Sequence, residues 1–223
     1  MIRALIFDFD GLILDTETTE YRAWQEIYAQ FGCALPLDSW IAAIGLAWGT
    51  FDPHHQLEAT LGRSLDRETL RKQRHARFLE LVTAEPVLPG VLDYLHTAQR
   101  LGISLAVASS SPRHWVVGHL DRLGLTGHFH AILSADDIPL AKPHPDLYLA
   151  ALAALGVHAE EAIALEDSPN GITAAKRAGL YCVAVPNSLL RALPLELADL
   201  RLNSLADLPL EALLAQAAAG ANN

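Results

Sequence analysis

The sequence predicts an α/β fold in which a doubly wound parallel sheet carries an all-helical insertion after its first strand. Short β-rich runs alternate with amphipathic helices after about residue 88, the pattern of a parallel sheet covered by helices on both faces. Between the first and second expected strands, roughly seventy residues separate Asp15 from Pro86, several times the usual crossover length. With 51% hydrophobic residues among 223, the chain can bury a core of this size.

Five strands are expected in the sheet, each a short apolar run bounded by turn residues. Helices between them show apolar residues at helical spacing and end at glycines. One such helix follows Pro89 and stops at Gly102, and another stops at Gly156. The expected strands are residues 4–7, 104–108, 131–133, 162–165 and 182–185.

The insertion is predicted to be a helical domain of its own. Its first helix ends at Gly32 and a later helix spans about 66–82. The chain is expected to leave the core near residues 14–16 and to rejoin it near residues 85–90. This assigns residues 1–15 and 87–223 to the α/β core and residues 16–86 to the insertion. The first helix carries one apolar stripe, formed by Tyr21, Trp24, Ile27, Tyr28 and Phe31.

Charge and hydropathy exclude several classes of partner. The chain has 26 acidic and 16 basic residues and a formal charge of −10, whereas nucleic acids and anionic membranes require an excess of Lys and Arg. No apolar stretch reaches the ~20 residues of a membrane-spanning helix. The first residues lack the apolar segment of a signal peptide, so we expect a cytoplasmic protein.

Polar side chains stand where the predicted strands end, which is the edge at which open parallel sheets bind ligands. Asp8 and Asp10 follow the first strand, two residues apart. An extended chain would place both on one side, about 7 Å apart at their backbones. Glu166 and Asp167 follow the fourth strand. The sequence therefore predicts four carboxylates on one edge of the sheet.

The second and third strands are followed by groups that suit a phosphate. Ser109 and Ser110 come directly after the second strand, and Ser111 before Pro112 is expected to be the N-cap of the next helix. Backbone amides at the start of a helix attract anions. Lys142, one of three lysines in the chain, follows the third strand.

Each of these groups also has a purely structural explanation, as a turn, a helix cap or a solvated charge. Four strand ends that together supply acids, hydroxyls and a cation fit a phosphoryl-transfer site better. Clustered carboxylates repel one another unless a cation neutralises them, and a hard divalent ion with oxygen ligands does this well. We therefore expect Mg²⁺ as the cofactor.

These motifs resemble those of the haloacid dehalogenase-like hydrolase superfamily, in the β-phosphoglucomutase-like and CbbY-like phosphatase subgroup with a helical cap. The resemblance extends over almost the whole chain, and the insertion corresponds to the cap. The motifs stand in the family's order, with the segment 8–11 (DFDG) first, then Ser109, Lys142 and the pair Glu166 and Asp167.

The resemblance implies roles for the acidic residues. Asp8 would be the nucleophile that forms an aspartyl-phosphate, and Asp10 would act first as acid and then as base. Mg²⁺ would be held by the side chains of Asp8 and Asp167, by the backbone carbonyl of Asp10, and by Glu166 directly or through water.

The resemblance also implies groups that hold the substrate. Ser109, the amide of Ser110 and Lys142 would hold the phosphate oxygens. Thr16 and Arg74 are candidates for contact with the substrate from the cap side.

The cap departs from the mutases of the family. Glu20, the third cap candidate, stands where they carry a His, and one of their cap arginines is replaced near Trp48. Trp48, Thr50 and His54 lie in a cap loop that could touch the substrate.

The preferred function is a Mg²⁺-dependent phosphatase for a small phosphorylated metabolite, such as a sugar phosphate, in a monomer or weak homo-oligomer. A phosphosugar mutase on the same scaffold is the alternative, which Glu20 disfavours. A haloacid dehalogenase would need neither Mg²⁺ nor Asp10. A phosphoacceptor signalling domain is roughly half as long and has no insertion.

Overall fold

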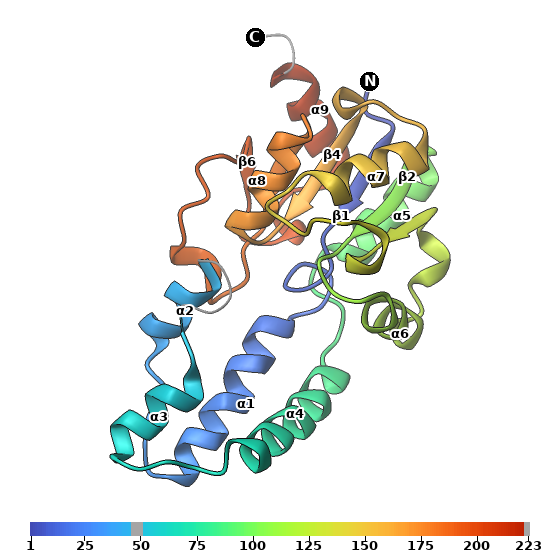
Figure 1. Cartoon of the computed structure of the whole chain (residues 1–223). Helices are drawn as coiled ribbons and strands as arrows, with labels where there is room; N and C mark the ends of the chain where they lie inside the picture. Colours follow the sequence, from blue (N-terminus) through green and yellow to red (C-terminus); the bar gives the residue numbers. More distant parts are fainter. Residues whose placement is uncertain (46–50, 221–223) are drawn as a thin grey trace.

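The core of the molecule is a six-stranded parallel sheet. The computed structural model describes residues 1–45 and 51–220. Its strand order is β3-β2-β1-β4-β5-β6, and every neighbouring pair is parallel. Figure 1 shows β1 running from the amino terminus toward α1. The strands are β1 (Ala4–Phe7), β2 (Ser104–Ala108), β3 (Ala131–Leu133), β4 (Ala162–Glu166), β5 (Tyr181–Ala184) and β6 (Leu200–Arg201).

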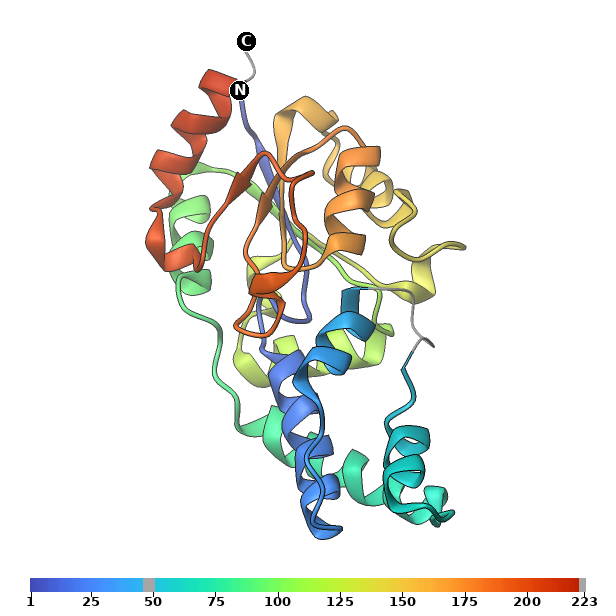
Figure 2. The ribbon, with the colours of Figure 1, turned by 90° about the vertical axis from the view of Figure 1, so that its left-hand side faces the viewer.

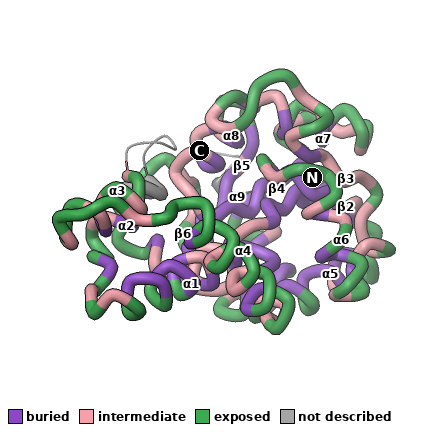
Figure 3. Tube along the Cα trace, turned by 60° about the horizontal axis from the view of Figure 1, so that its bottom comes forward, coloured by how far each residue is buried: buried purple, intermediate pink, exposed green. Residues whose placement is uncertain are grey.

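Helices cover both faces of the sheet. Alternate strand residues point to opposite sides, so apolar side chains on each side pack against helices. Leu5 and Phe7 pack with α5 (Val91–Leu101), α6 (Arg113–Leu123) and α9 (Leu210–Gly220). Ala4 and Ile6 pack on the other face with α7 (Asp146–Leu155) and α8 (Pro169–Arg177). Figure 3 shows buried residues along β4 and along part of α1. The expected doubly wound, Rossmann-like core is thereby confirmed.

Within residues 16–86, the described part of the chain forms helices and no strand. They are α1 (Thr16–Gln30), α2 (Leu37–Gly45), α3 (Pro53–Leu61) and α4 (Arg67–Ala84). Figures 1 and 2 show them gathered below the sheet. Their shared core contains the expected stripe of α1, from Tyr21 to Tyr28, together with Trp40, Leu57 and Leu70. The helical insertion is therefore present, and its limits at residues 16 and 86 stay a prediction.

The two segments that join the insertion to the core pair with each other. Leu14 forms an antiparallel bridge with Val87, and the backbone N–H of Leu88 donates to the carbonyl of Ile13 at 2.9 Å. Gly11, with a φ of +84°, turns the chain before this bridge. The entry and exit of the insertion therefore meet at one joint beside the end of β1.

The expected element limits agree with the structure to within one residue for the five strands. β4 extends one residue further than expected, to Glu166, and β5 begins and ends one residue earlier. The helices that were expected to stop at Gly102 and Gly156 do so, each glycine adopting a left-handed conformation. No helix in the described ranges combines the length and hydropathy that crossing a bilayer requires.

Candidate active site

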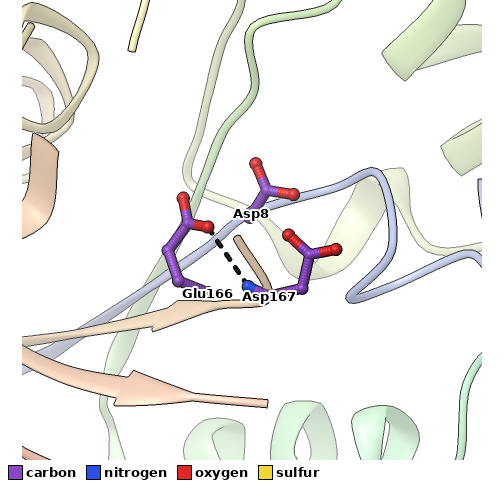
Figure 4. Close-up of side chains that lie close together, drawn as sticks. All are labelled: Asp8, Glu166 and Asp167. Atoms are coloured by element: carbon purple, nitrogen blue, oxygen red, sulfur yellow. Dashed lines mark hydrogen bonds between the residues drawn. The ribbon is translucent and has the colours of Figure 1, made fainter. Parts of the chain in front are cut away.

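Three buried carboxylates meet at the carboxyl ends of two neighbouring strands. Asp8 follows β1, Glu166 ends β4 and Asp167 follows it, and the parallel register places Phe7 opposite Leu165. One carboxylate oxygen from each acid lies within 4.8 Å of the others. Figure 4 shows Asp8 and Asp167 turned toward the same space, with Glu166 beside them. The exposed fraction is 7% for Asp8, 0% for Glu166 and 3% for Asp167.

Lys142 lies among these acids. Its Nζ donates to Asp8 Oδ1 at 2.5 Å, to Glu166 Oε1 at 2.6 Å and to the carbonyl of Ala108 at 2.8 Å. The Tyr148 hydroxyl donates to Glu166 Oε1 at 2.6 Å. The Lys142 side chain is only 6% exposed, so these charges interact with little screening by water.

The acids outnumber the cation in this cluster, and their pKa values show the consequence. Burial raises the pKa of Asp8 to about 8, and the charges of Glu166 and Asp10 add to the rise, although Lys142 opposes it. Burial, Asp8 and Glu166 raise the pKa of Asp167 well above its usual range. Burial alone would lower the pKa of Lys142, but Asp8 and Glu166 outweigh it and raise this pKa.

The donor set fits a hard divalent cation. Three buried carboxylates face a single ammonium group, and oxygen-rich clusters of this kind suit Mg²⁺ or Ca²⁺. The backbone approaches two of the acids closely because glycine stands beside each. A Cβ on Gly11 would lie 1.9 Å from Asp167 Oδ2, and a Cβ on Gly171 would lie 2.0 Å from the Glu166 carboxylate. A divalent ion would supply the positive charge that the cluster lacks.

The Asp10 carboxylate is turned away from this cluster and accepts hydrogen bonds from the loop after β2 and from α6. Ser111 Oγ donates to Asp10 Oδ2 at 2.6 Å, and Ser109 Oγ does so at 3.3 Å. The indole N–H of Trp115 donates to Asp10 Oδ1 at 3.0 Å. The expected N-cap role of Ser111 is wrong: Pro112 is the N-cap residue of α6, since the Ser111 hydroxyl is engaged with Asp10.

The serines after β2 differ in exposure. Ser109 is 1% exposed, and its Oγ accepts a hydrogen bond from the Ser111 backbone N–H at 3.0 Å. Ser110 is exposed. Both follow the strand that neighbours β1, so they lie on the same edge of the sheet as Asp8.

Two of the three cap candidates bind each other. Arg74 Nη1 donates to both Glu20 carboxylate oxygens at 2.9 Å, and each side chain is 19% exposed. The Arg74 guanidinium also lies 5.8 Å from the centre of the Trp24 ring. Thr16 begins α1 next to the joint, and its buried Oγ1 has no hydrogen-bond partner within residues 1–45 and 51–220. Because Glu20 pairs with Arg74, the charge of Arg74 is already balanced within the cap.

Of the three residues expected in the cap loop, His54 lies instead in the first turn of α3, and Trp48 and Thr50 lie outside the described residues. The His54 ring packs edge-to-face on Trp24 with centroids 4.7 Å apart, and its buried Nδ1 has no hydrogen-bond partner in the described part of the chain.

Sequence reasoning missed two residues near Asp10. One is Trp115, whose indole binds the Asp10 carboxylate. The other is Glu17 in the first turn of α1, whose pKa is raised to about 7 by burial and by the charges of Asp10 and Glu20. The available signal for Glu17 was a second acid two residues after Asp15, at the start of the insertion.

Comparison with known proteins identifies the family of this chain. The family model described as haloacid dehalogenase-like hydrolase matches residues 5–185. YhcW of Bacillus subtilis (strain 168), which bears a phosphatase name, is 49% identical over 214 residues, covering 96% of this chain and 97% of that protein. Hexitol phosphatase B of Escherichia coli (strain K12) is 32% identical, covering 96% and 97%.

A solved structure shows the same likeness. The crystal structure of CbbY from Rhodobacter sphaeroides in complex with phosphate matches with a TM-score of 0.68 and 30% identity, covering 93% of this chain and 96% of that one. The resemblance expected from the four motifs is confirmed, and the chain belongs to the haloacid dehalogenase-like hydrolases.

Proposed function

We propose that this protein is a Mg²⁺-dependent phosphatase that hydrolyses a small phosphorylated metabolite, such as a sugar phosphate, through an aspartyl-phosphate on Asp8. The observation that carries the proposal is the buried cluster of Asp8, Glu166 and Asp167 around Lys142. Two relatives with phosphatase names, one of them a hexitol phosphatase, support it.

Asp8 is the nucleophile in this proposal. One of its carboxylate oxygens attacks phosphorus while the ester P–O bond breaks, and Asp10 gives a proton to the leaving oxygen. A water molecule then attacks the phosphorus of the aspartyl-phosphate, Asp10 takes its proton, and the bond to Asp8 breaks. Asp10 thus serves both half-reactions, as acid and then as base.

Four acidic residues would hold the metal, three through their side chains and one through its backbone carbonyl. Asp8 and Asp167 would bind with their side chains, Glu166 directly or through water, and Asp10 with its backbone carbonyl. When bound, Mg²⁺ neutralises charge on the phosphate and on the nucleophile. The side chain of Asp10, which lies outside the carboxylate cluster, stays available for proton transfer.

Groups that follow two strands, β2 and β3, hold the phosphate. Lys142 supplies a positive charge, Ser109 a hydroxyl and Ser110 a backbone N–H. Charge resides on the transferring oxygens throughout the reaction, so fixed donors of this kind stabilise the transition state. Thr16, Glu20 and Arg74 would contact the leaving group from the cap, which helps to exclude water.

Hydrolysis should require a divalent ion, and the ion should also stabilise the fold. Mg²⁺ at 100 times its Kd contributes about 2.7 kcal/mol, which for a chain of this length raises the melting temperature by roughly 5–10 °C. Phosphate release from a panel of phosphorylated metabolites and melting curves are measured with Mg²⁺ and with a chelator. Asp167→Asn should lose most of the melting shift, whereas Asp93→Asn, at an exposed position, should keep it. Full hydrolysis in the chelator would refute the metal requirement.

A phosphosugar mutase is the second candidate, since the family scaffold serves both reactions. A mutase must protect its aspartyl-phosphate from water while the sugar reorients, and its cap must hold a second phosphate. The Glu20 carboxylate already neutralises Arg74 here, which argues against a distal-phosphate site. Incubation with β-glucose 1-phosphate separates the two: a phosphatase releases inorganic phosphate, and a mutase forms glucose 6-phosphate.

The setting of the enzyme belongs to the same proposal. The formal charge of −10 disfavours nucleic acid and anionic membranes as partners, which agrees with a small metabolite as the substrate. The cytoplasmic location and the monomeric or weakly oligomeric state stay predictions.

A further inference from the structure

Trp115 joins the proposed acid/base residue to a helix of the cap. It stands in the first turn of α6 and directs its indole N–H to Asp10 Oδ1 at 3.0 Å. The Trp115 ring also contacts two other aromatic side chains. The Trp115 ring stacks on Phe78 of α4, with centroids 5.5 Å apart and planes 15° apart, and meets His119 edge-on at 4.2 Å.

The contact between α4 and α6 is fixed at a second point. Arg122 of α6 donates to the carbonyls of Val82 and Thr83 at 3.3 and 3.0 Å, and to that of Glu85 at 3.4 Å. Val82 and Thr83 belong to the last turn of α4, and Glu85 is its C-cap residue, so Arg122 binds the end of the helix where regular backbone pairing stops. A cation at this end also interacts favourably with the helix dipole. Trp115 is therefore part of a connected junction between cap and core.

We propose that Trp115 is a positioning residue for Asp10, which sets the direction of its carboxylate according to the placement of α4. The inference rests on the proposed function, because it assigns Asp10 the proton transfer. Asp10 receives hydrogen bonds from Trp115, Ser111 and Ser109, and these hold its carboxylate toward α6. Only the Trp115 donor is carried by a ring that also packs on the cap.

The expected consequence concerns substrates whose leaving group needs a proton. An alkoxide leaves with difficulty unless an acid protonates it, whereas p-nitrophenolate leaves unprotonated at neutral pH. A misdirected Asp10 should therefore slow phosphoryl transfer from an alkyl phosphate and spare transfer from p-nitrophenyl phosphate. Because Trp115 does not touch the substrate in this proposal, KM for the alkyl phosphate should change little.

The test compares Trp115→Phe with Trp40→Phe. Trp115→Phe keeps an aromatic ring for Phe78 and removes the N–H. Trp40→Phe removes a buried indole N–H that has no hydrogen-bond partner among the described residues, so it is a matched control. For the alkyl phosphate hydrolysed fastest in the panel, kcat/KM should fall roughly 10-fold to 100-fold in Trp115→Phe, a part of the general-acid contribution. The control should be unchanged.

A second variant tests the link to the cap. Phe78→Leu keeps the N–H of Trp115 and removes the ring on which it stacks. It should reproduce the loss for the alkyl phosphate in part and spare p-nitrophenyl phosphate. Melting temperatures show whether each variant is folded.

Three results would overturn the proposal. They are an equal loss of kcat/KM for both substrates in Trp115→Phe, no loss of kcat/KM for either, or a loss confined to KM. The comparison uses kcat/KM because it reports phosphoryl transfer, whereas slower hydrolysis of the shared aspartyl-phosphate would lower kcat for both substrates. Asp8→Asn, measured in parallel, keeps the two levels separate. If it retains activity the proposed function fails, whereas an inactive Asp8→Asn with a fully active Trp115→Phe rejects the positioning role alone.

Discussion

Replacing Asp8 by Asn should lower kcat/KM by at least about 10³-fold for every phosphate ester that the enzyme hydrolyses. The amide has nearly the shape of the carboxylate but lacks its negative charge and cannot form the aspartyl-phosphate. The loss should be as large for p-nitrophenyl phosphate as for a sugar phosphate, since both need the nucleophile. Initial rates of phosphate release at saturating Mg²⁺ measure it.

The fold should survive this change. Asp8 is one of three buried acids around a single lysine, and its own pKa is raised to about 8, so removing its charge relieves repulsion. Asp8→Asn should therefore melt at or above the temperature of the native chain without metal. Asp93→Asn, at an exposed position, should leave both activity and melting temperature unchanged. Full turnover by Asp8→Asn would exclude Asp8 as the nucleophile.

Replacing Lys142 by Met should cost both stability and activity. The lysine lies between Asp8 and Glu166, and removing one partner of a buried ion pair typically costs about 3–5 kcal/mol. For a chain of this length the melting temperature should fall by roughly 6–20 °C. Loss of the charge that holds the phosphate should lower kcat by a further factor of about 10².

Lys176→Met is the matched control for this prediction. Lys176 pairs with Asp199 at 2.6 Å, but both side chains are about one-third exposed, and pairs of this kind contribute about 0–1 kcal/mol. Its melting temperature should therefore change by only a few degrees. A similar, small effect in both variants would show that Lys142 does not hold the acidic cluster together. Excess Mg²⁺ should restore part of the stability of Lys142→Met, because the ion supplies positive charge at the same carboxylates.

The convergence of the acids could be predicted because parallel strands end at one edge. Asp8, Lys142 and Glu166 are far apart in sequence, yet each follows or ends a strand of the same sheet. The strand pattern and the one-edge rule were enough to expect their proximity. The geometry of Lys142 between two carboxylates could not be expected, because it depends on a tertiary hydrogen bond to the Ala108 carbonyl and on the Tyr148 ring, whose centre lies 5.1 Å from Lys142 Nζ.

The surroundings of Asp10 show where local sequence rules stop. Ser111 before Pro112 has the local signal of an N-cap, but a tertiary hydrogen bond to Asp10 takes its hydroxyl. Trp115 is a partly buried aromatic residue in an amphipathic helix, and its contact with Asp10 joins residues 105 positions apart.

The sixth strand of the sheet could not be predicted either. β6 has only two residues, which are too few to show a periodic pattern.

The central claim is that Asp8 becomes phosphorylated during turnover, and rapid-quench analysis of Asp10→Asn with p-nitrophenyl phosphate tests it most directly. Without the Asp10 base, the good leaving group still departs but the aspartyl-phosphate is hydrolysed slowly. The account predicts a burst of p-nitrophenol of about one equivalent per enzyme, and a phosphoryl group on Asp8 in the quenched protein. Release of p-nitrophenol without a burst, or a phosphoryl group on another residue, would contradict it.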